Sequence, residues 1–559
     1  MTHPLFDKHI TLLRQAIAAA ETRASWSPYP DAPASRGKQV VENGREAFES
    51  YRDASFYLDQ PGLIDRVGSE QSPYGLPLNI TYPRCAPDAL IIAAQSAMTA
   101  WVEAGPDVRT GVCLEILDQL HDHGVEIAHA VMHTTGQPFA LAYQYSLAGA
   151  LDRGLEAVAT SYREMKQGPG RTVWEKPQGK HQALKIERTY TVAPRGIALS
   201  ICSPSEPTSL CWPGIFASLV TGNPVIVHAH SASVLPLAMT VAVARQVIKE
   251  AGFDPNLISL LVDETGISSA NMVGLRAEIR IIDCCGDTAT AEWLGENAHQ
   301  AAIFSLNPGA NCVVIDSTGD YQAMLRNLTF SLCLNSGQLA ATPRMILVSR
   351  EGVRTPDGVV SSEQFGRDLA AAIGKLAESA PRAVEILGAI QSPELLQMIE
   401  QARDGAGSDD NESLLRDISR LQHPQWPLAL VATPLLLKKE LGDQFEFLAN
   451  VKGPIAFLAE SATTTEALSM TERIMRDQGA LNFSIYTNSA PLQQMAQGIA
   501  SRVGVALNVN LTGNLLISQN EGFADFYASG ENKSSTCSLI DVAFVARRFF
   551  VVQTRRQLD

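Results

Sequence analysis

Short apolar runs alternate with helix-length segments from Arg195 onward, and this alternation constrains the fold more than any other feature. Runs suited to buried parallel strands occupy residues 196–202, 225–227, 257–262 and 279–283. Residues 234–251, between the second and third runs, have the pattern of a helix. Strands that alternate with helices of this length predict a parallel α/β sheet, in which binding sites lie at the carboxyl ends of the strands.

Length and charge exclude several classes of protein. The 559 residues allow about three or four domains at roughly 150 residues each. The net charge of −15 argues against nucleic acid as a main partner, because phosphate binding requires a basic surface. No apolar run approaches the ~20 residues of a membrane span, and the N-terminus lacks the basic and apolar regions of a signal peptide. We therefore expect a cytoplasmic protein with no membrane segment.

The cysteine and histidine patterns predict no metal site. The nine cysteines are an odd number and widely spread, as in reduced cytoplasmic proteins. No Cys-x-x-Cys pair occurs. His129 and His133 have the i, i+4 spacing of a helical metal site, but no Glu stands in the His-Glu-x-x-His position between them.

The remaining segments divide the chain into four parts. Residues 87–165 read as successive helices, residues 185–192 alternate like an exposed strand, and residues 544–552 have strand composition. A second α/β unit begins near Phe304, with strands around residues 312–316 and 345–348. The expected divisions are an N-terminal extension (1–84), helices with a Rossmann-like unit (85–303, including a strand at 183–193), a second α/β unit (304–505) and a return segment with a terminal strand (506–559).

Residues 335–343 read Asn-Ser-Gly-Gln-Leu-Ala-Ala-Thr-Pro. This segment resembles the nucleophile loop of aldehyde dehydrogenases, Asn-Ser-Gly-Gln-x-Cys-Thr-x-Pro. Further segments that fit the motifs of that superfamily, in the same order, are residues 216–227, 508–513, 523–526 and 543–549. From about residue 85 onward the chain therefore resembles the aldehyde dehydrogenase superfamily, and most closely its PaaN-type branch, associated with phenylacetate catabolism.

The resemblance implies both an architecture and an assembly. The implied fold is α/β, with a Rossmann-like parallel-sheet domain, a second α/β catalytic domain and β-strand oligomerisation elements. Those elements correspond to the strand at 183–193 and the C-terminal strand, so a homodimer that acts on a small molecule is expected.

The resemblance also implies that the family's reacting groups are absent. Ala340 stands at the nucleophilic Cys, and its methyl group cannot form the thiohemiacetal that precedes hydride transfer. Leu306 stands at the general-base Glu and cannot accept a proton. Leu210 stands at the Asn whose amide stabilises the oxyanion, a donor whose loss alone costs about 10²–10³ in rate.

The family's cofactor contacts are replaced as well. His228 stands at the Lys that binds the adenosine ribose, and Asp287 stands at the Ser of a Gly-Ser pair near the pyrophosphate. Asn450 stands at a Glu that binds the nicotinamide ribose, and Lys452 stands at a neighbouring Phe. A carboxylate at a helix N-terminus repels phosphates, so no cofactor is predicted, and NAD(P) is implied by ancestry alone.

Two sets of residues are candidates to replace the lost groups. Cys211 and Cys285, near strand carboxyl ends, could be relocated nucleophiles, although free cysteines are more often buried small residues. His228, Asp287 and Lys452 could form an acid/base set, or be solvated remnants of a lost site. Glu206, which precedes the expected oxyanion segment, is a further candidate of that kind.

Three hypotheses of function follow. The first is a repurposed enzyme that performs non-redox chemistry on an acyl or aldehyde compound, including CoA-linked ones, without NAD. The second is a non-catalytic scaffold or binding partner. The third is an NAD(P)-dependent aldehyde dehydrogenase inactivated by design, but a designed change would replace the nucleophile alone, and here about six positions differ.

Overall fold

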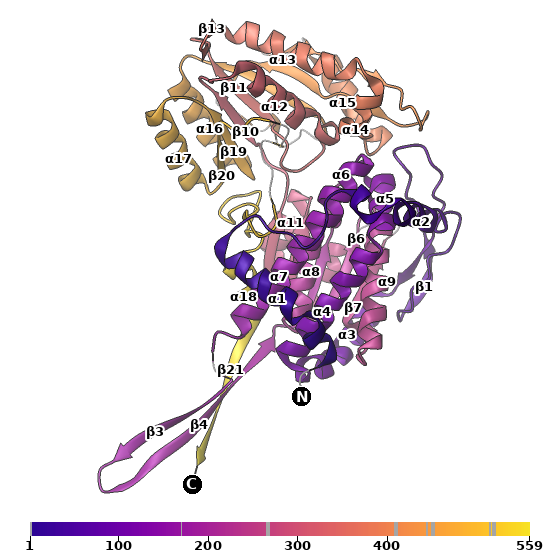
Figure 1. Cartoon of the computed structure of the whole chain (residues 1–559), viewed down its shortest axis with the longest axis vertical. Helices are drawn as coiled ribbons and strands as arrows, with labels where there is room; N and C mark the ends of the chain where they lie inside the picture. The colour runs from indigo at the N-terminus through magenta and orange to yellow at the C-terminus, as the bar shows by residue number, and fades with distance from the viewer. Residues whose placement is uncertain are drawn as a thin grey trace.

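The computed structural model describes residues 3–168, 170–263, 269–406, 412–442, 445, 447–448, 453–513, 516 and 521–558. Two α/β lobes form the body, and a narrow three-stranded ribbon projects from the first of them (Figure 1). Within these residues, no helix combines the length and apolar character that crossing a membrane requires.

The first lobe contains a five-stranded parallel sheet with the order β7-β6-β5-β8-β9. Its strands are β5 (Ile197–Ile201), β6 (Val225–Ala229), β7 (Ile258–Val262), β8 (Ile279–Cys285) and β9 (Ala302–Leu306). Its helices are α8 (Trp212–Val220), α9 (Leu235–Glu250), α10 (Ala270–Gly274) and α11 (Thr288–Asn297). The predicted strands and the predicted helix at 234–251 are confirmed, because buried parallel strands are near-continuous apolar runs.

Helices from the N-terminal third pack on α8, α9 and one another, and one of them, α3 (Pro87–Glu103), also contacts β5, β6 and β7 of this sheet (Figure 1). They are α1 (Pro4–Thr22), α2 (Lys38–Glu49), α3, α4 (Gly105–Asp122), α5 (Gly124–Thr135), α6 (Phe139–Tyr143) and α7 (Ala150–Met165). A π-helical turn, Gln144–Gly149, joins α6 to α7. A short hairpin of β1 (Leu63–Val67) and β2 (Tyr82–Cys85) precedes α3. The expected helical region is therefore confirmed.

The second lobe contains a seven-stranded sheet with the order β14-β17-β18-β11-β10-β19-β20. Its strands are β10 (Cys312–Ile315), β11 (Met345–Ser349), β14 (Glu412–Arg416), β17 (Leu435–Lys439), β18 (Ile455–Ser461), β19 (Asn482–Tyr486) and β20 (Ala506–Val509). Its helices are α12 (Tyr321–Cys333), α13 (Ser362–Ala377), α14 (Ala380–Leu387), α15 (Pro393–Gly405), α16 (Thr464–Gln478) and α17 (Ala490–Val503). Phe304, where this unit was expected to begin, lies in β9, so the chain enters the second sheet only at β10.

The ribbon consists of β3 (Arg171–Gln178), β4 (His181–Pro194) and β21 (Phe549–Leu558), in the order β21-β4-β3. The strand expected at 185–192 is confirmed. The strand expected at 544–552 starts only at Phe549, because residues Val542–Ala546 form helix α18. The Asp541 carboxylate accepts the backbone N–H of Phe544 at 2.6 Å and caps that helix, which apolar composition alone does not reveal.

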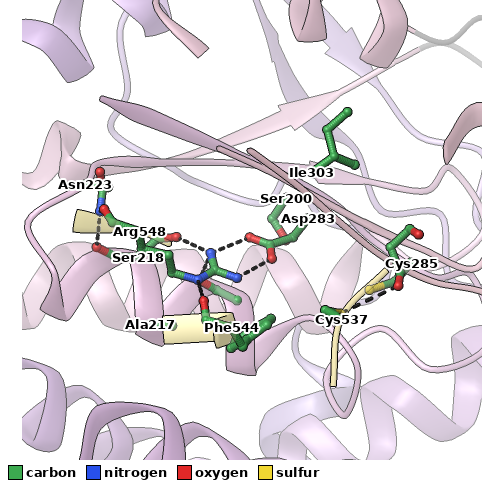
Figure 2. Close-up of polar contacts among 12 residues, drawn as sticks. Ser200, Ala217, Ser218, Asn223, Asp283, Cys285, Ile303, Cys537, Phe544 and Arg548 are labelled. Atoms are coloured by element: carbon green, nitrogen blue, oxygen red, sulfur yellow. Dashed lines mark hydrogen bonds and ion pairs between the residues drawn. The ribbon is translucent and has the colours of Figure 1, made fainter. Parts of the chain in front are cut away.

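Arg548 ties the ribbon to the first sheet (Figure 2). Its guanidinium is fully buried and donates to both carboxylate oxygens of Asp283 on β8, at 2.5 and 2.8 Å. It also donates to Ser218 Oγ at 2.7 Å, and the rings of Phe304 and Phe544 lie 4.4 and 4.2 Å from its central carbon. The paired charges and aromatic faces satisfy a cation that could not otherwise be buried.

Candidate functional site

The loop at residues 335–343 lies between α12 and β11, at the boundary of the two lobes. Asn335 and Ser336 both have φ of +51°, which the surrounding hydrogen bonds hold in place. Ser336 Oγ donates to the carbonyls of Leu387 and Ala432 at 3.0 and 2.8 Å. Asn311 Nδ2 donates to the carbonyl of Ala340 at 2.9 Å. The loop is therefore a rigid, preorganised structure despite the methyl side chain at its apex.

A buried carboxylate occupies the apex of this loop. Glu206 has no exposed surface, and its Oε2 accepts the backbone N–H of Ala340 at 2.8 Å. Its Oε1 accepts the hydroxyl of Tyr145 at 2.7 Å. Burial raises the pKa of Glu206, while these two hydrogen bonds and the charge of Arg153 oppose the rise. The N–H at position 340 thus already has an anionic partner.

Leu210 and Leu306 lie in the same buried apolar cluster as Ala340. Leu210 is buried, and its carbonyl is 3.6 Å from the thiol of Cys285. Leu306 ends β9, is buried, and forms an isolated bridge with Ser535. In the segment after β5, the side chain that hydrogen-bonds to the backbone of Ala340 is that of Glu206. The sequence signal was a charged residue before Pro207 in an otherwise uncharged loop.

The two candidate thiols are both buried. Cys211 precedes helix α8 with 1% of its surface exposed, and burial raises its pKa well above the usual thiol value. Cys285 ends β8 with 7% exposed. A thiol becomes reactive through exposure and a lowered pKa, so the geometry does not favour a relocated cysteine nucleophile.

His228 lies at the carboxyl end of β6 and pairs with Asp263 at the end of β7. His228 Nε2 lies 2.6 Å from Asp263 Oδ2. Burial by itself would raise the pKa of Asp263, but hydrogen bonds from His228 and Ser269 outweigh it and lower that pKa. Among the residues described, His228 Nδ1 is buried with no hydrogen-bond partner. It is therefore an orphaned polar atom at the edge where sites form.

Asp287 caps helix α11 rather than joining His228. Its carboxylate accepts the backbone N–H of Ala289 at 3.2 Å and the hydroxyl of Thr290 at 2.5 Å. Asn450 and Lys452 lie outside the described residues. The expected set of His228, Asp287 and Lys452 is thus not assembled within the described chain, and His228 is paired with Asp263 instead.

A cavity of about 530 Å³ opens beside the loop. Leu339 and Ala341, which flank Ala340, lie in its wall, and so does Tyr145 on the π-helical turn. Residues from five separated parts of the chain complete the wall: Ser25, Trp26, Ser27, Tyr29, Pro30, Asp31, Ala140, Leu141, Gln144, Ala148, Gly149, Asp152, Phe330, Leu334, Glu385, Ile386, Leu516, Glu521, Gly522 and Tyr527. Sequence reasoning missed the contribution of residues 25–31, because it depends on tertiary folding of the N-terminal extension.

A parallel sheet with an open carboxyl edge, and a second α/β lobe that presents a rigid loop to a cavity, form a two-lobed α/β fold with the ligand-binding edge of such sheets. The family model described as "Aldehyde dehydrogenase family" matches residues 84–515. The chain belongs to the aldehyde dehydrogenase family.

Solved structures agree with this membership. An NAD-dependent aldehyde dehydrogenase from Burkholderia multivorans is 42% identical over 100% of both chains, with a TM-score of 0.96. An NADP-dependent glyceraldehyde-3-phosphate dehydrogenase from Bacillus halodurans C-125, complexed with NADP, is 17% identical over 89% of this chain and 96% of that one, with a TM-score of 0.67. A Thermus thermophilus 1-pyrroline-5-carboxylate dehydrogenase variant is 15% identical over 96% of this chain and 100% of that one, with a TM-score of 0.71.

The prediction that the chain uses no cofactor is contradicted by these structures. The Burkholderia protein is NAD-dependent, and the Bacillus protein holds NADP in the same fold. The fold is therefore one that binds nicotinamide dinucleotides. The prediction failed because it weighed single side chains at 228, 287 and 450, whereas the sheet edge that receives the dinucleotide is built by the whole lobe.

The described residues fit a ribose of a dinucleotide better than its pyrophosphate. The orphaned Nδ1 of His228 can hydrogen-bond a ribose hydroxyl. Gly286 has φ of +92°, and a Cβ there would lie 3.0 Å from Ser203 Oγ, so a glycine is required where this turn packs against Ser203. The Asp287 carboxylate, next in the chain, opposes a pyrophosphate at the same helix end.

Asp287→Ser is expected to tighten binding of NAD⁺ by roughly 5- to 30-fold, because it removes about 1–2 kcal/mol of charge repulsion. Serine is as good an N-cap as aspartate, so the melting temperature should change little. Calorimetric titration with NAD⁺ measures the affinity, and Asp320→Ser, at the cap of α12 in the second lobe, is the matched control. Equal tightening in both variants would contradict the assignment of this helix end.

Proposed function

We propose that this chain binds a small aldehyde or acyl compound in the cavity and transfers protons on it, instead of oxidising it through a thioester. One observation supports the proposal above others: the loop N–H at Ala340 donates to the buried carboxylate of Glu206. With Ala340 in place of the family's Cys, no thiohemiacetal forms. The PaaN-type assignment is part of this proposal and rests on the sequence resemblance.

Tyr145 links the cavity to Glu206. Its ring lines the cavity, and its hydroxyl donates to the carboxylate at 2.7 Å. Burial and the neighbouring Glu206 raise the pKa of Tyr145, so its phenol stays protonated. When the phenol oxygen takes a proton from the α-carbon of a carbonyl compound, the phenol's own proton passes to Glu206. The C–H bond breaks, an enolate forms, and Glu206 becomes a carboxylic acid.

Tyr527 is placed to stabilise such an enolate. Its ring lines the cavity and is buried, and its hydroxyl interacts with that of Tyr145, the proposed proton carrier. Burial raises the pKa of this phenol, so the group is a hydrogen-bond donor at neutral pH. A donor aimed at the oxygen where charge develops is the usual means of lowering such a barrier.

The proposal includes a nicotinamide dinucleotide at the carboxyl edge of the first sheet, because the NAD-dependent Burkholderia protein is similar over its whole length. His228, Asp263 and Asp287 would line it, and the bound group would supply a hydride acceptor. We expect binding without aldehyde-dependent reduction, since Ala340 offers no thiol to the substrate.

We also propose a homodimer formed through the ribbon. Phe550, Val551 and Val552 on β21 are 46%, 54% and 44% exposed, an apolar stripe at a sheet edge. Such an edge is stabilised by pairing with another strand. Light scattering should give twice the 60.2 kDa chain mass, and a monomer would contradict the interface.

Hydrogen exchange on an aldehyde tests the proton-transfer activity. With phenylacetaldehyde in D₂O, the chain is expected to speed α-hydrogen exchange, followed by NMR, above the buffer rate. Glu206→Gln should lower the catalysed rate about 10²- to 10⁴-fold, the usual contribution of a general base. Asp316→Asn, distant in the second lobe and also buried, is the control for structural damage. Exchange at the buffer rate with the unaltered chain would overturn the proposal and favour the non-catalytic alternative.

A further inference from the structure

The charged side chains that line the cavity beside the loop are all acidic. Four carboxylates line it, and its described wall contains no lysine, arginine or histidine. Asp31, Glu385 and Glu521 are exposed at its rim, whereas Asp152 is only 9% exposed. Clefts lined by one sign of charge concentrate ligands of the opposite sign.

The buried member of this set faces the ligand space. Asp152 follows the π-helical turn at the start of α7, and its Oδ1 accepts the hydroxyl of Ser27 at 2.8 Å. Burial raises the pKa of Asp152 to about 8, in spite of the Ser27 hydrogen bond and the charge of Arg153. A cation placed next to this carboxyl would favour its charged form, and the two would form a desolvated ion pair.

The rest of the wall is aromatic and apolar. Trp26, Tyr29, Tyr145, Phe330 and Tyr527 contribute rings from four parts of the chain. Tyr527 is 2% exposed, and its hydroxyl interacts with that of Tyr145 in the same wall. Aromatic faces beside carboxylates stabilise organic cations by cation–π attraction.

We propose that this cavity selects a small organic cation with an apolar body, such as an amine-bearing carbonyl compound. This inference rests on the proposed function, because it names the charge of the ligand of that same site. The volume of about 530 Å³ is within the range of small-molecule pockets. The acidic wall also disfavours CoA-linked compounds, whose phosphates would meet carboxylates.

A matched series of probes tests the charge selectivity. 2-Phenylethylamine, 2-phenylethanol and 3-phenylpropanoate share a phenylethyl body and differ in charge; each is titrated calorimetrically into the full chain, as is CoA. We expect the amine to bind at least 10-fold more tightly than the alcohol, with no saturable binding of the propanoate or CoA in this cavity. Asp152→Asn, which keeps the acceptor for Ser27, should lower amine affinity at least 10-fold and leave alcohol affinity unchanged.

Two results would overturn the inference: propanoate or CoA binding as tightly as the amine, or unchanged amine affinity in Asp152→Asn. CoA could also bind at the carboxyl edge of the first sheet, where the dinucleotide is proposed to bind. NAD⁺ would compete with CoA bound there, and such binding does not bear on the charge selectivity of the cavity. Failure here is distinguishable from failure of the proposed function, since hydrogen exchange on the neutral phenylacetaldehyde does not depend on a cationic group.

Discussion

Replacement of Arg548 with methionine is expected to destabilise the protein by about 3–5 kcal/mol, the usual cost of leaving one buried charge unpaired. The guanidinium is the bidentate partner of Asp283, which is only 5% exposed. Without it the carboxylate loses its ion pair and both of these hydrogen bonds. The variant should therefore lose a large part of the usual 5–15 kcal/mol stability of a folded domain.

Differential scanning calorimetry, with hydrogen exchange of the ribbon, measures this effect. Exchange is expected to rise first in β21 and β4, which Arg548 joins to the sheet. Arg547→Ala is the matched control: this neighbour is exposed and lies 5.2 Å from the Phe304 ring, so it should cost only about 0.5–1 kcal/mol. The double variant Arg548→Met with Asp283→Asn should lose less unfolding free energy than the sum of the losses in the two single variants. Equal effects of the Arg547 and Arg548 substitutions would contradict the ion pair's role.

A thiol introduced by Ala340→Cys is expected to stay unreactive until Glu206 is neutralised. The backbone N–H of residue 340 contacts the Glu206 carboxylate, so the new sulfur would lie within a few ångströms of a negative charge. A neighbouring anion disfavours the thiolate, and a rise of about 1–2 pKa units lowers its population roughly 10- to 100-fold. Ala340→Cys with Glu206→Gln should therefore be alkylated by iodoacetamide about 10- to 100-fold faster than Ala340→Cys alone.

Peptide mass spectrometry at pH 8.5 follows this alkylation, and the native thiols give little background because all nine cysteines are buried. Glu385→Gln in the Ala340→Cys background is the control, since Glu385 lies at the exposed cavity rim. Equal alkylation rates with and without Glu206→Gln would place the carboxylate away from the loop apex.

The strands of the first lobe were predictable from sequence because buried parallel strands consist of short apolar runs. Residues 196–202 and 257–262 became β5 (Ile197–Ile201) and β7 (Ile258–Val262). The terminal strand was predicted too early, because the composition of residues 544–552 does not show that Asp541 caps a short helix before Arg548. Local capping therefore decided where an apolar segment changed from helix to strand.

The site was less accessible to sequence reasoning, because its contacts join distant segments. Motif order located the loop around Ala340, but the partner of its N–H, Glu206, is 134 residues away. Similarly, His228 was identified, while its partner Asp263 is supplied by the next strand of the sheet. The prediction of no cofactor was also wrong, because it rested on substitutions at single positions such as His228. The edge of a parallel sheet that receives a dinucleotide is formed by many residues.

We propose that the unaltered chain does not react covalently with aldehydes. Intact-protein mass spectrometry, after mixing the chain with stoichiometric phenylacetaldehyde and excess NAD⁺, tests it in a single turnover. We predict no mass increase on the protein and no NADH absorbance, because Ala340 presents a methyl group at the loop apex. An adduct of acyl-thioester mass, or NADH formed in proportion to the protein, would contradict the account.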